Sequence, residues 1–109
     1  MRPDVSVVIP CLNERATLDA CLDALEGQEF PWGRAEVIIV DGGSSDGSRQ
    51  IAQARGVKLL SDCARGPSRA RNIGIQAARA DIVAFTDADC APSPDWLARL
   101  RDVFSEDTD

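Results

Sequence analysis

The stretch Ile82-Val83-Ala84-Phe85-Thr86-Asp87-Ala88-Asp89-Cys90 decides how this chain is interpreted. Four apolar residues lead directly into two carboxylates that are one residue apart. A short apolar run that ends in polar residues is typical of a buried strand ending at an open sheet edge. There Asp87 and Asp89 would both be free to reach one hard cation, because Mg²⁺ and Mn²⁺ bind carboxylates together with water and phosphate oxygens. A solvated turn has the same pattern, so the rest of the chain must distinguish the two.

The composition indicates one soluble globular domain. The chain has 109 residues, of which 44% are hydrophobic and 28% are charged, which is enough to bury a core without a metal or disulfide. A net charge of −6 argues against a nucleic-acid partner, which would favour a basic face. No apolar run approaches membrane-spanning length, so we expect no membrane span.

The cysteines are expected to be reduced. Cys11, Cys21, Cys63 and Cys90 are widely spaced, and the chain has no Cys-x-x-Cys pair and no histidine. This argues against a zinc site and against a nucleophile activated by an imidazole. Residues 1–4 show no signal-peptide features. We therefore expect a cytoplasmic location, which includes the cytoplasmic face of a membrane.

Strand and helix patterns alternate four times along the chain. Strands are predicted at residues 5–9 (closed by Pro10), 35–40, 57–60 (near a sheet edge) and 82–86. The first helix is predicted from a cap at Asn13 to Gly27, and the second over residues 46–55. The third is predicted to begin at Pro67 and to turn small residues toward the sheet, and the fourth to begin at residues 93–95 with Phe104 on its inner face. This alternation predicts an α/β fold, a Rossmann-like parallel sheet flanked by helices.

Polar residues follow three of the predicted strands. Asn13 and Glu14 follow the first strand, residues 41–45 follow the second, and Asp87 with Asp89 follows the fourth. Ligands of open parallel sheets bind outside the carboxyl ends of the strands. We therefore expect all three groups to lie at one edge of the sheet.

Two kinds of ligand chemistry meet at that edge. The carboxylates suit a divalent metal, and Arg65, Arg69 and Arg71 suit phosphate oxygens. Gly42 and Gly43 would let backbone amides approach a ligand closely near a helix N-terminus. A metal-bridged diphosphate ester, such as a nucleotide sugar, satisfies both requirements.

Four segments resemble the motifs of family 2 glycosyltransferases, which have the GT-A fold. They are residues 5–14, 40–47, 70–74 and 86–89, in the order of the family. The resemblance implies the sheet order 3-2-1-4 and makes residues 1–109 the N-terminal, donor-binding half of such an enzyme. The expected partners are a nucleoside diphosphate sugar and an acceptor that the sequence does not identify.

The resemblance also implies roles for individual residues. Pro10, Asn13 and Glu14 would border the nucleoside, and Asp41 would contact the base. Arg71 would sit near the base or the diphosphate. Asp87 would reach the ribose and the metal, and Asp89 would be the main protein ligand of Mg²⁺ or Mn²⁺.

The chain departs from the family pattern at two points. Gly42 stands where many members have a second Asp, so one polar contact to the nucleoside is expected to be missing. Family members continue with an acceptor-binding half that carries the general base, so we expect no catalytic residue in these 109 residues and no activity of the chain alone. Transfer in the family is generally inverting. An exposed apolar patch is expected where the other half would pack.

Alternative functions remain open from the sequence. A dinucleotide-binding domain or a P-loop NTPase would need glycine motifs that are absent. A phosphatase with an aspartyl nucleophile would also place Asp-x-Asp after a strand, although Ala91 stands where Thr or Val is expected. A non-catalytic nucleotide-binding module that docks on another subunit is the third possibility.

Overall fold

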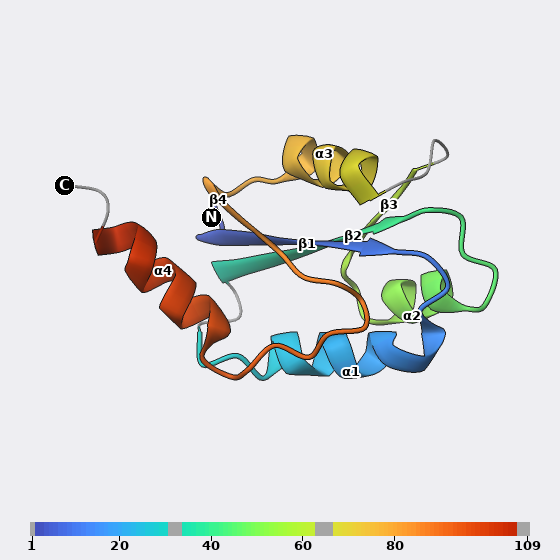
Figure 1. Cartoon of the computed structure of the whole chain (residues 1–109), viewed down its shortest axis with the longest axis horizontal. Helices are drawn as coiled ribbons and strands as arrows, with labels where there is room; N and C mark the ends of the chain where they lie inside the picture. The colour runs from blue at the N-terminus through green and yellow to red at the C-terminus, as the bar shows by residue number, and fades with distance from the viewer. Residues whose placement is uncertain (1, 31–33, 63–66, 107–109) are drawn as a thin grey trace.

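The four predicted strands form one parallel sheet with helices on both faces (Figure 1). The computed structural model describes residues 2–30, 34–62 and 67–106. The strands are β1 (Val5–Cys11), β2 (Ala35–Asp41), β3 (Lys58–Ser61) and β4 (Ile82–Phe85), and the helices are α1 (Arg15–Glu26), α2 (Ser48–Ala54), α3 (Pro67–Ala77) and α4 (Trp96–Glu106). The sheet order is β3-β2-β1-β4 with every pairing parallel, so the predicted order 3-2-1-4 is confirmed.

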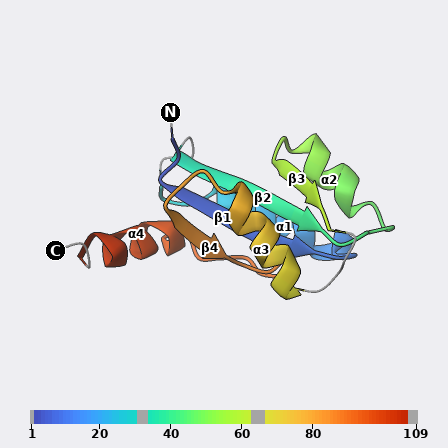
Figure 2. The same ribbon diagram turned by 90° about the horizontal axis from the view of Figure 1, so that it is seen from above.

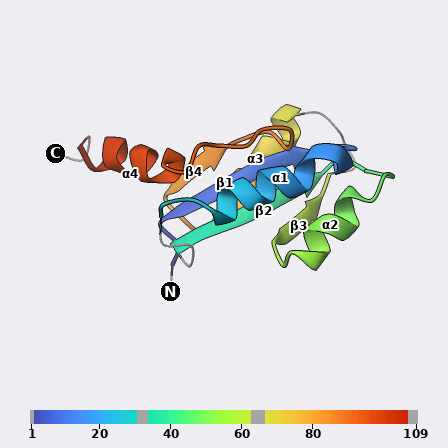
Figure 3. The ribbon, with the colours of Figure 1, turned by 90° about the horizontal axis from the view of Figure 1, so that it is seen from below.

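Alternate residues of the central strands divide the core into two layers. Val7 and Ile9 of β1 pack with Leu18 and Leu22 of α1 on one face of the sheet, whereas Val8 packs with α3 on the other. Figure 2 shows α3 lying over the sheet, and Figure 3 shows α1 along the opposite face. Because strand side chains alternate in direction, β-branched residues at successive positions fill both layers.

Helix α3 packs unusually close to the sheet. A Cβ atom built on Gly74 would lie 2.3 Å from Cγ1 of Val8, far inside normal carbon–carbon contact. Ala70, one turn earlier, is also buried against this layer. The prediction that small residues let this helix approach the sheet is therefore confirmed.

The prediction that Pro10 closes the first strand is wrong, because β1 continues to Cys11 and Pro10 pairs with Val40 of β2. On the other side of β1, the neighbouring strand β4 ends before it reaches Pro10. β4 pairs with β1 only as far as Phe85, and the last bond runs from the Thr86 amide to the Val8 carbonyl at 3.3 Å. The next bond of a parallel ladder would need an N–H from residue 10, which proline lacks. The proline is tolerated here because β4 has left the sheet.

Two helix starts also differ from prediction. Asn13 does not cap α1; its φ is 54° and the N-cap residue is Glu14, with no side-chain cap. α4 starts at Trp96, after a turn in which Ser93 Oγ donates to Asp95 Oδ1 at 3.0 Å. The side chain of Phe104 lies outside the described part of the chain.

The expected buried fourth strand is a half-exposed edge strand. Phe85 is 39% exposed, and β4 and α4 border an open groove of about 310 Å³ lined by Ile82, Val83, Ala84, Phe85, Trp96 and Leu100. This apolar groove is open because no further element covers it among the described residues, and the packing of another half of the fold against this edge stays a prediction. β3, at the other edge, was correctly predicted there. Within the described ranges, no helix has the length and apolarity to cross a membrane.

Candidate functional site

The loops after β1 and β2 are joined by reciprocal hydrogen bonds. The Asn13 amide donates to Ser44 Oγ at 2.8 Å, and the Ser45 amide donates to Asn13 Oδ1 at 2.8 Å. Asn13 has a left-handed backbone, which asparagine tolerates better than most residues. It therefore connects two loops instead of capping a helix.

Glu14 lies beside the start of α2. Its amide donates to Ser48 Oγ at 3.0 Å, and the next amide, that of Arg15, donates to Asp46 Oδ2 at 3.0 Å. Pro10 is half-buried at the end of β1, just before this loop. The three residues expected to border the nucleoside, Pro10, Asn13 and Glu14, thus lie in one segment that the β2 loop supports.

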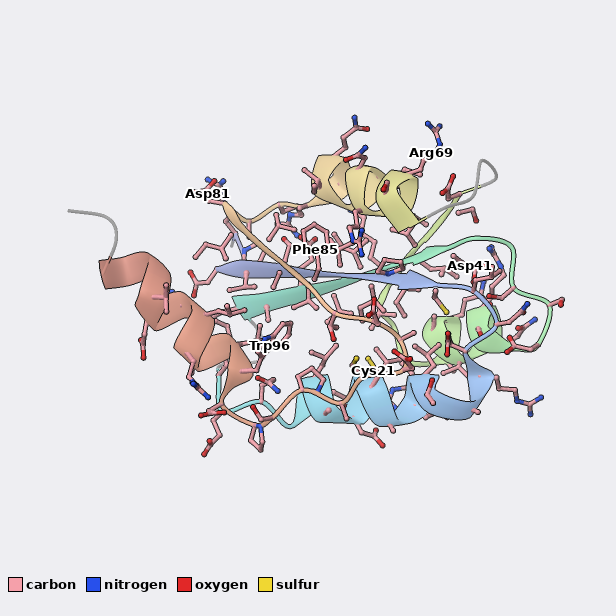
Figure 4. The ribbon with its side chains drawn as sticks, in the orientation of Figure 1. Cys21, Asp41, Arg69, Asp81, Phe85 and Trp96 are labelled. Carbon is pink, nitrogen blue, oxygen red and sulfur yellow. The ribbon has the colours of Figure 1, made fainter. Side chains whose placement is uncertain are left out.

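Asp41 is buried at the end of β2, with 1% of its surface exposed. Its Oδ2 accepts the amides of Gly43 at 3.0 Å and Ser44 at 2.9 Å, and also Arg49 Nη1 at 3.2 Å. Its Oδ1 accepts the Ser44 hydroxyl. Figure 4 shows Asp41 at this end of the sheet. The carboxylate thereby organises the loop from inside.

The hydrogen bonds determine the protonation state of Asp41. Burial would raise the pKa of this carboxyl, but the donors from Ser44, Gly43 and Arg49 outweigh burial and lower its pKa below the usual 3.8. The amides of Gly42 and Gly43 were expected to face a ligand. The Gly42 amide donates to the Cys11 carbonyl at 2.9 Å, and the Gly43 amide donates to the Asp41 carboxylate. The contact between Asp41 and a base stays a prediction, and in this arrangement the carboxylate is turned inward.

Asp87 and Asp89 are both exposed immediately after β4, as predicted. Ligand atoms of Asp87, Asp89 and Cys90 lie within 4.8 Å of one another. The turn is closed by the Cys90 amide, which donates to the Asp87 carbonyl at 3.0 Å. The Cys90 thiol lies 3.6 Å from Asp89 Oδ1.

The segment carrying these carboxylates is fastened to α1. Ala88, between the two exposed aspartates, is 2% exposed and belongs to the core. Thr17 Oγ1 donates to the Ala88 carbonyl at 3.0 Å, and Cys21 Sγ lies 3.7 Å from the Asp87 carbonyl. Figure 1 shows the segment after β4 running down to α1, and Figure 4 shows Cys21 on the side of α1 that faces it. The two aspartates therefore project from an anchored turn.

The donor set fits a hard divalent cation. Two exposed carboxylates at this separation can share one Mg²⁺ or Mn²⁺ and leave its remaining positions to water and phosphate oxygens. A thiol is a soft ligand that such cations do not favour, so Cys90 would not be expected to take part. Asp87 and Asp89 are thus the residues that would hold the metal.

The arginines Arg69 and Arg71 make few contacts with the other residues of the site. Arg71 is exposed on α3, and it has no hydrogen bond or ion pair among the described residues. Arg69 Nε lies 3.4 Å from Asp62 Oδ1, and its side chain is exposed. Arg65 lies outside the described residues. The structure therefore does not bring Arg71 into contact with the other predicted site residues.

Several residues that shape the site were not predicted from the sequence. Thr17 and Cys21 are one helical turn apart on the inner face of α1. The only feature of the sequence that could have indicated their role is the hydroxyl of Thr17 beside the apolar positions of this helix. Arg49 Nη1 donates to Ser61 Oγ at 2.9 Å as well as to Asp41, and it thereby bridges these two residues. That bridge depends on the packing of α2 against β3, which the sequence pattern does not specify.

Comparison with known proteins relates this chain to one family. The model of the family described as glycosyl transferase family 2 matches residues 6–109. Glycosyltransferase AglE from Haloferax volcanii is 40% identical over 103 residues, which are 89% of this chain and 34% of the relative. The chain thus spans about a third of the length of this curated relative.

Two solved structures share the fold of this chain. S. aureus TarS in complex with UDP-GlcNAc superposes with a TM-score of 0.87 at 28% identity, covering 94% of this chain and 31% of that one. The mannosyltransferase PcManGT from Pyrobaculum calidifontis, in complex with GDP-Man and Mn²⁺, gives a TM-score of 0.78 at 34% identity, covering 90% and 31%. The fold is that of the N-terminal part of a GT-A glycosyltransferase, and the chain belongs to glycosyl transferase family 2.

Proposed function

We propose that this chain is the donor-binding part of a glycosyltransferase, which binds a nucleoside diphosphate sugar with the help of Mg²⁺ or Mn²⁺. The observation that carries the proposal is the anchored pair Asp87 and Asp89 at the carboxyl edge of the sheet. Glu14 lies next to this pair, because Thr17 Oγ1 is 3.3 Å from Glu14 Oε2 and 3.0 Å from the Ala88 carbonyl. The proposed metal-binding and nucleoside-binding elements are thus adjacent.

The related structures support the class of donor. TarS has been solved with UDP-GlcNAc, and PcManGT with GDP-Man and Mn²⁺. These ligands share a diphosphate and differ in base and sugar. We infer that this chain recognises the same diphosphate element and leave base and sugar to experiment.

The residues of this chain would act by binding and orientation. Asp87 and Asp89 would hold the cation, and Pro10, Asn13, Glu14 and Asp41 would form the nucleoside side of the site. A divalent cation between the phosphates would stabilise negative charge on the departing nucleoside diphosphate. Arg71, which projects into solvent, would be available to a phosphate oxygen.

Acceptor binding and the general base are proposed to lie in the part of the family fold that this chain does not cover. The chain spans 34% of AglE and 31% of PcManGT. We infer an inverting transfer by the complete enzyme, to a glycan, lipid or other acceptor, and donor binding without transfer by the 109-residue chain. A cytoplasmic location is also proposed; the free thiols of Cys11, Cys21 and Cys90 are consistent with a reducing compartment.

The test is nucleotide binding with and without manganese. UDP and GDP are titrated into the parent chain by calorimetry in the presence and absence of Mn²⁺, and one of them is expected to bind more tightly with the metal. Asp89→Ala should abolish this metal-dependent gain because it removes the main carboxylate ligand. Asp87→Ala should weaken binding under both conditions if it also contacts the ribose.

Asp81→Ala is the matched control. Asp81 lies just before β4, at the opposite end of that strand, where it forms an exposed ion pair with Arg2 (Figure 4). Exposed pairs contribute little to stability, so this variant should bind like the parent. Unchanged manganese dependence in Asp89→Ala would refute the metal assignment, and sugar transfer by the 109-residue chain alone would refute the proposed division of labour.

A further inference from the structure

The side of α1 that faces the Asp87–Asp89 turn carries two donors one helical turn apart. Thr17 Oγ1 reaches the carbonyl of Ala88, and Cys21 Sγ reaches the carbonyl of Asp87, at 3.0 and 3.7 Å. These are consecutive carbonyls of the turn that presents the aspartates. With both carbonyls directed at the helix and the Ala88 side chain in the core, the peptide planes on either side of Ala88 are fixed.

The Thr17 hydroxyl also contacts the nucleoside side of the site. It lies 3.3 Å from Glu14 Oε2 and 3.4 Å from the Glu14 carbonyl, compared with 3.0 Å from the Ala88 carbonyl. A hydroxyl has one proton to donate, so these three acceptors compete for it. A ligand that engages the Glu14 carboxylate would leave the proton to Ala88 and tighten the turn.

We propose that Thr17 is a positioning residue that holds the Asp87–Asp89 turn and couples it to Glu14. The proposal rests on the proposed function, because the turn matters as the element that binds the cation. Thr17 itself need not touch metal or nucleotide. Its effect would pass through the backbone of Ala88.

The variant that tests this is Thr17→Val, with Thr17→Ser as its matched control. Valine keeps the branched shape of threonine and lacks the hydroxyl, whereas serine keeps the hydroxyl and loses only a methyl group. Removing one hydrogen bond of ordinary strength predicts that Mn²⁺ tightens nucleoside diphosphate binding about fivefold less in Thr17→Val than in the parent. Thr17→Ser should retain the parent's manganese effect.

A second measurement follows the turn without any ligand. Cys21 is buried under the turn, whereas Cys90 is exposed. Pulsed alkylation, followed by mass spectrometry of the peptides, gives a rate for each cysteine in the native chain. Thr17→Val should raise the Cys21 rate about fivefold and leave the rate of Cys11, buried in β1, unchanged. Equal acceleration of both would indicate general destabilisation and would overturn the proposal.

The two measurements separate failure of the inference from failure of the proposed function. If manganese tightens binding equally in the parent and in Thr17→Val, the positioning role is refuted and the donor site stands. If the parent shows no manganese effect, the proposed function fails, and the Cys21 rate decides the rest. A faster rate in Thr17→Val supports the anchoring of the turn, and an unchanged rate refutes it.

Discussion

Replacing Gly74 with alanine tests the close approach of α3 to the sheet. The added Cβ would lie 2.3 Å from Cγ1, 2.9 Å from Cγ2 and 3.1 Å from Cβ of Val8. Ordinary carbon–carbon contact begins near 3.5 Å, so helix and strand must separate by about 1 Å. Val8 is fully buried in a strand paired on both sides and β-branched, so its side chain cannot easily rotate away.

The expected cost follows from two opposing effects. Overpacking a core by a methyl group costs about 1–3 kcal/mol, and the rigidity of Val8 favours the upper part of that range. Alanine in place of glycine inside a helix returns about 1 kcal/mol. The net loss of about 1–2 kcal/mol should lower the Tm by roughly 5–15 °C for a domain of this size.

The assay is equilibrium urea unfolding of the parent, Gly74→Ala, Val8→Ala and the double variant. Val8→Ala alone should be destabilising because it leaves a cavity. In the double variant the new methyl group occupies part of that cavity, so the two losses should compensate by about 1 kcal/mol or more. Gly27→Ala is the control, because its Cβ would meet nothing closer than 3.4 Å. A Gly74→Ala variant as stable as the parent, or strict additivity in the cycle, would refute the reasoning.

Three further predictions concern other parts of the chain. Asp41→Asn should lower the free energy of unfolding by about 1–3 kcal/mol at pH 7, because Arg49 loses its buried charged partner. The pKa of Asp41 in the folded chain lies below 3.8, so its stabilising effect is present above that pH, and the unfolding curves of parent and variant should converge as the pH falls further. Burial, followed by the neighbouring Cys90, raises the pKa of Cys21 to about 11. Alkylation of Cys21 should therefore be slow at pH 7 and accelerate as the pH rises toward 11, and a rate at pH 7 equal to that of exposed Cys90 would contradict this. Phe85→Lys should reduce self-association in sedimentation experiments without lowering stability, because it places a charge on an exposed edge strand. Unchanged association would show that this strand edge does not mediate self-association.

The sequence allowed the architecture to be predicted well because it is encoded locally. The apolar runs around Val7 and Ile38 and the helical spacing of Leu18 and Leu22 each identify one element, and alternation then leaves few topologies. The exposure of Asp87 and Asp89 followed from the same logic, since polar residues at a strand end face the ligand edge.

The errors arose where a residue's role depends on partners distant in the sequence. Asn13 carries the composition of a helix cap, but its partners are Ser44 and Ser45, about thirty residues away. For Asp41 the sequence did not show that the amides of its own loop and Arg49 would hold the carboxylate inward, and its contact with a base stays a prediction. Such competition between local and long-range partners is decided by packing, which periodicity does not contain.

The proline in β1 has a consequence for the aspartates that follow β4. Any other residue at position 10 would present an amide to the Thr86 carbonyl, and the ladder between β1 and β4 could continue toward Asp87 and Ala88. Continued pairing would commit the Ala88 carbonyl to β1 instead of Thr17, and the hydrogen bond that fastens the turn to α1 would be lost. Pro10 therefore ends the pairing between these two strands, and this leaves the Asp87–Asp89 turn outside the sheet, where α1 can hold it through Thr17 and Cys21.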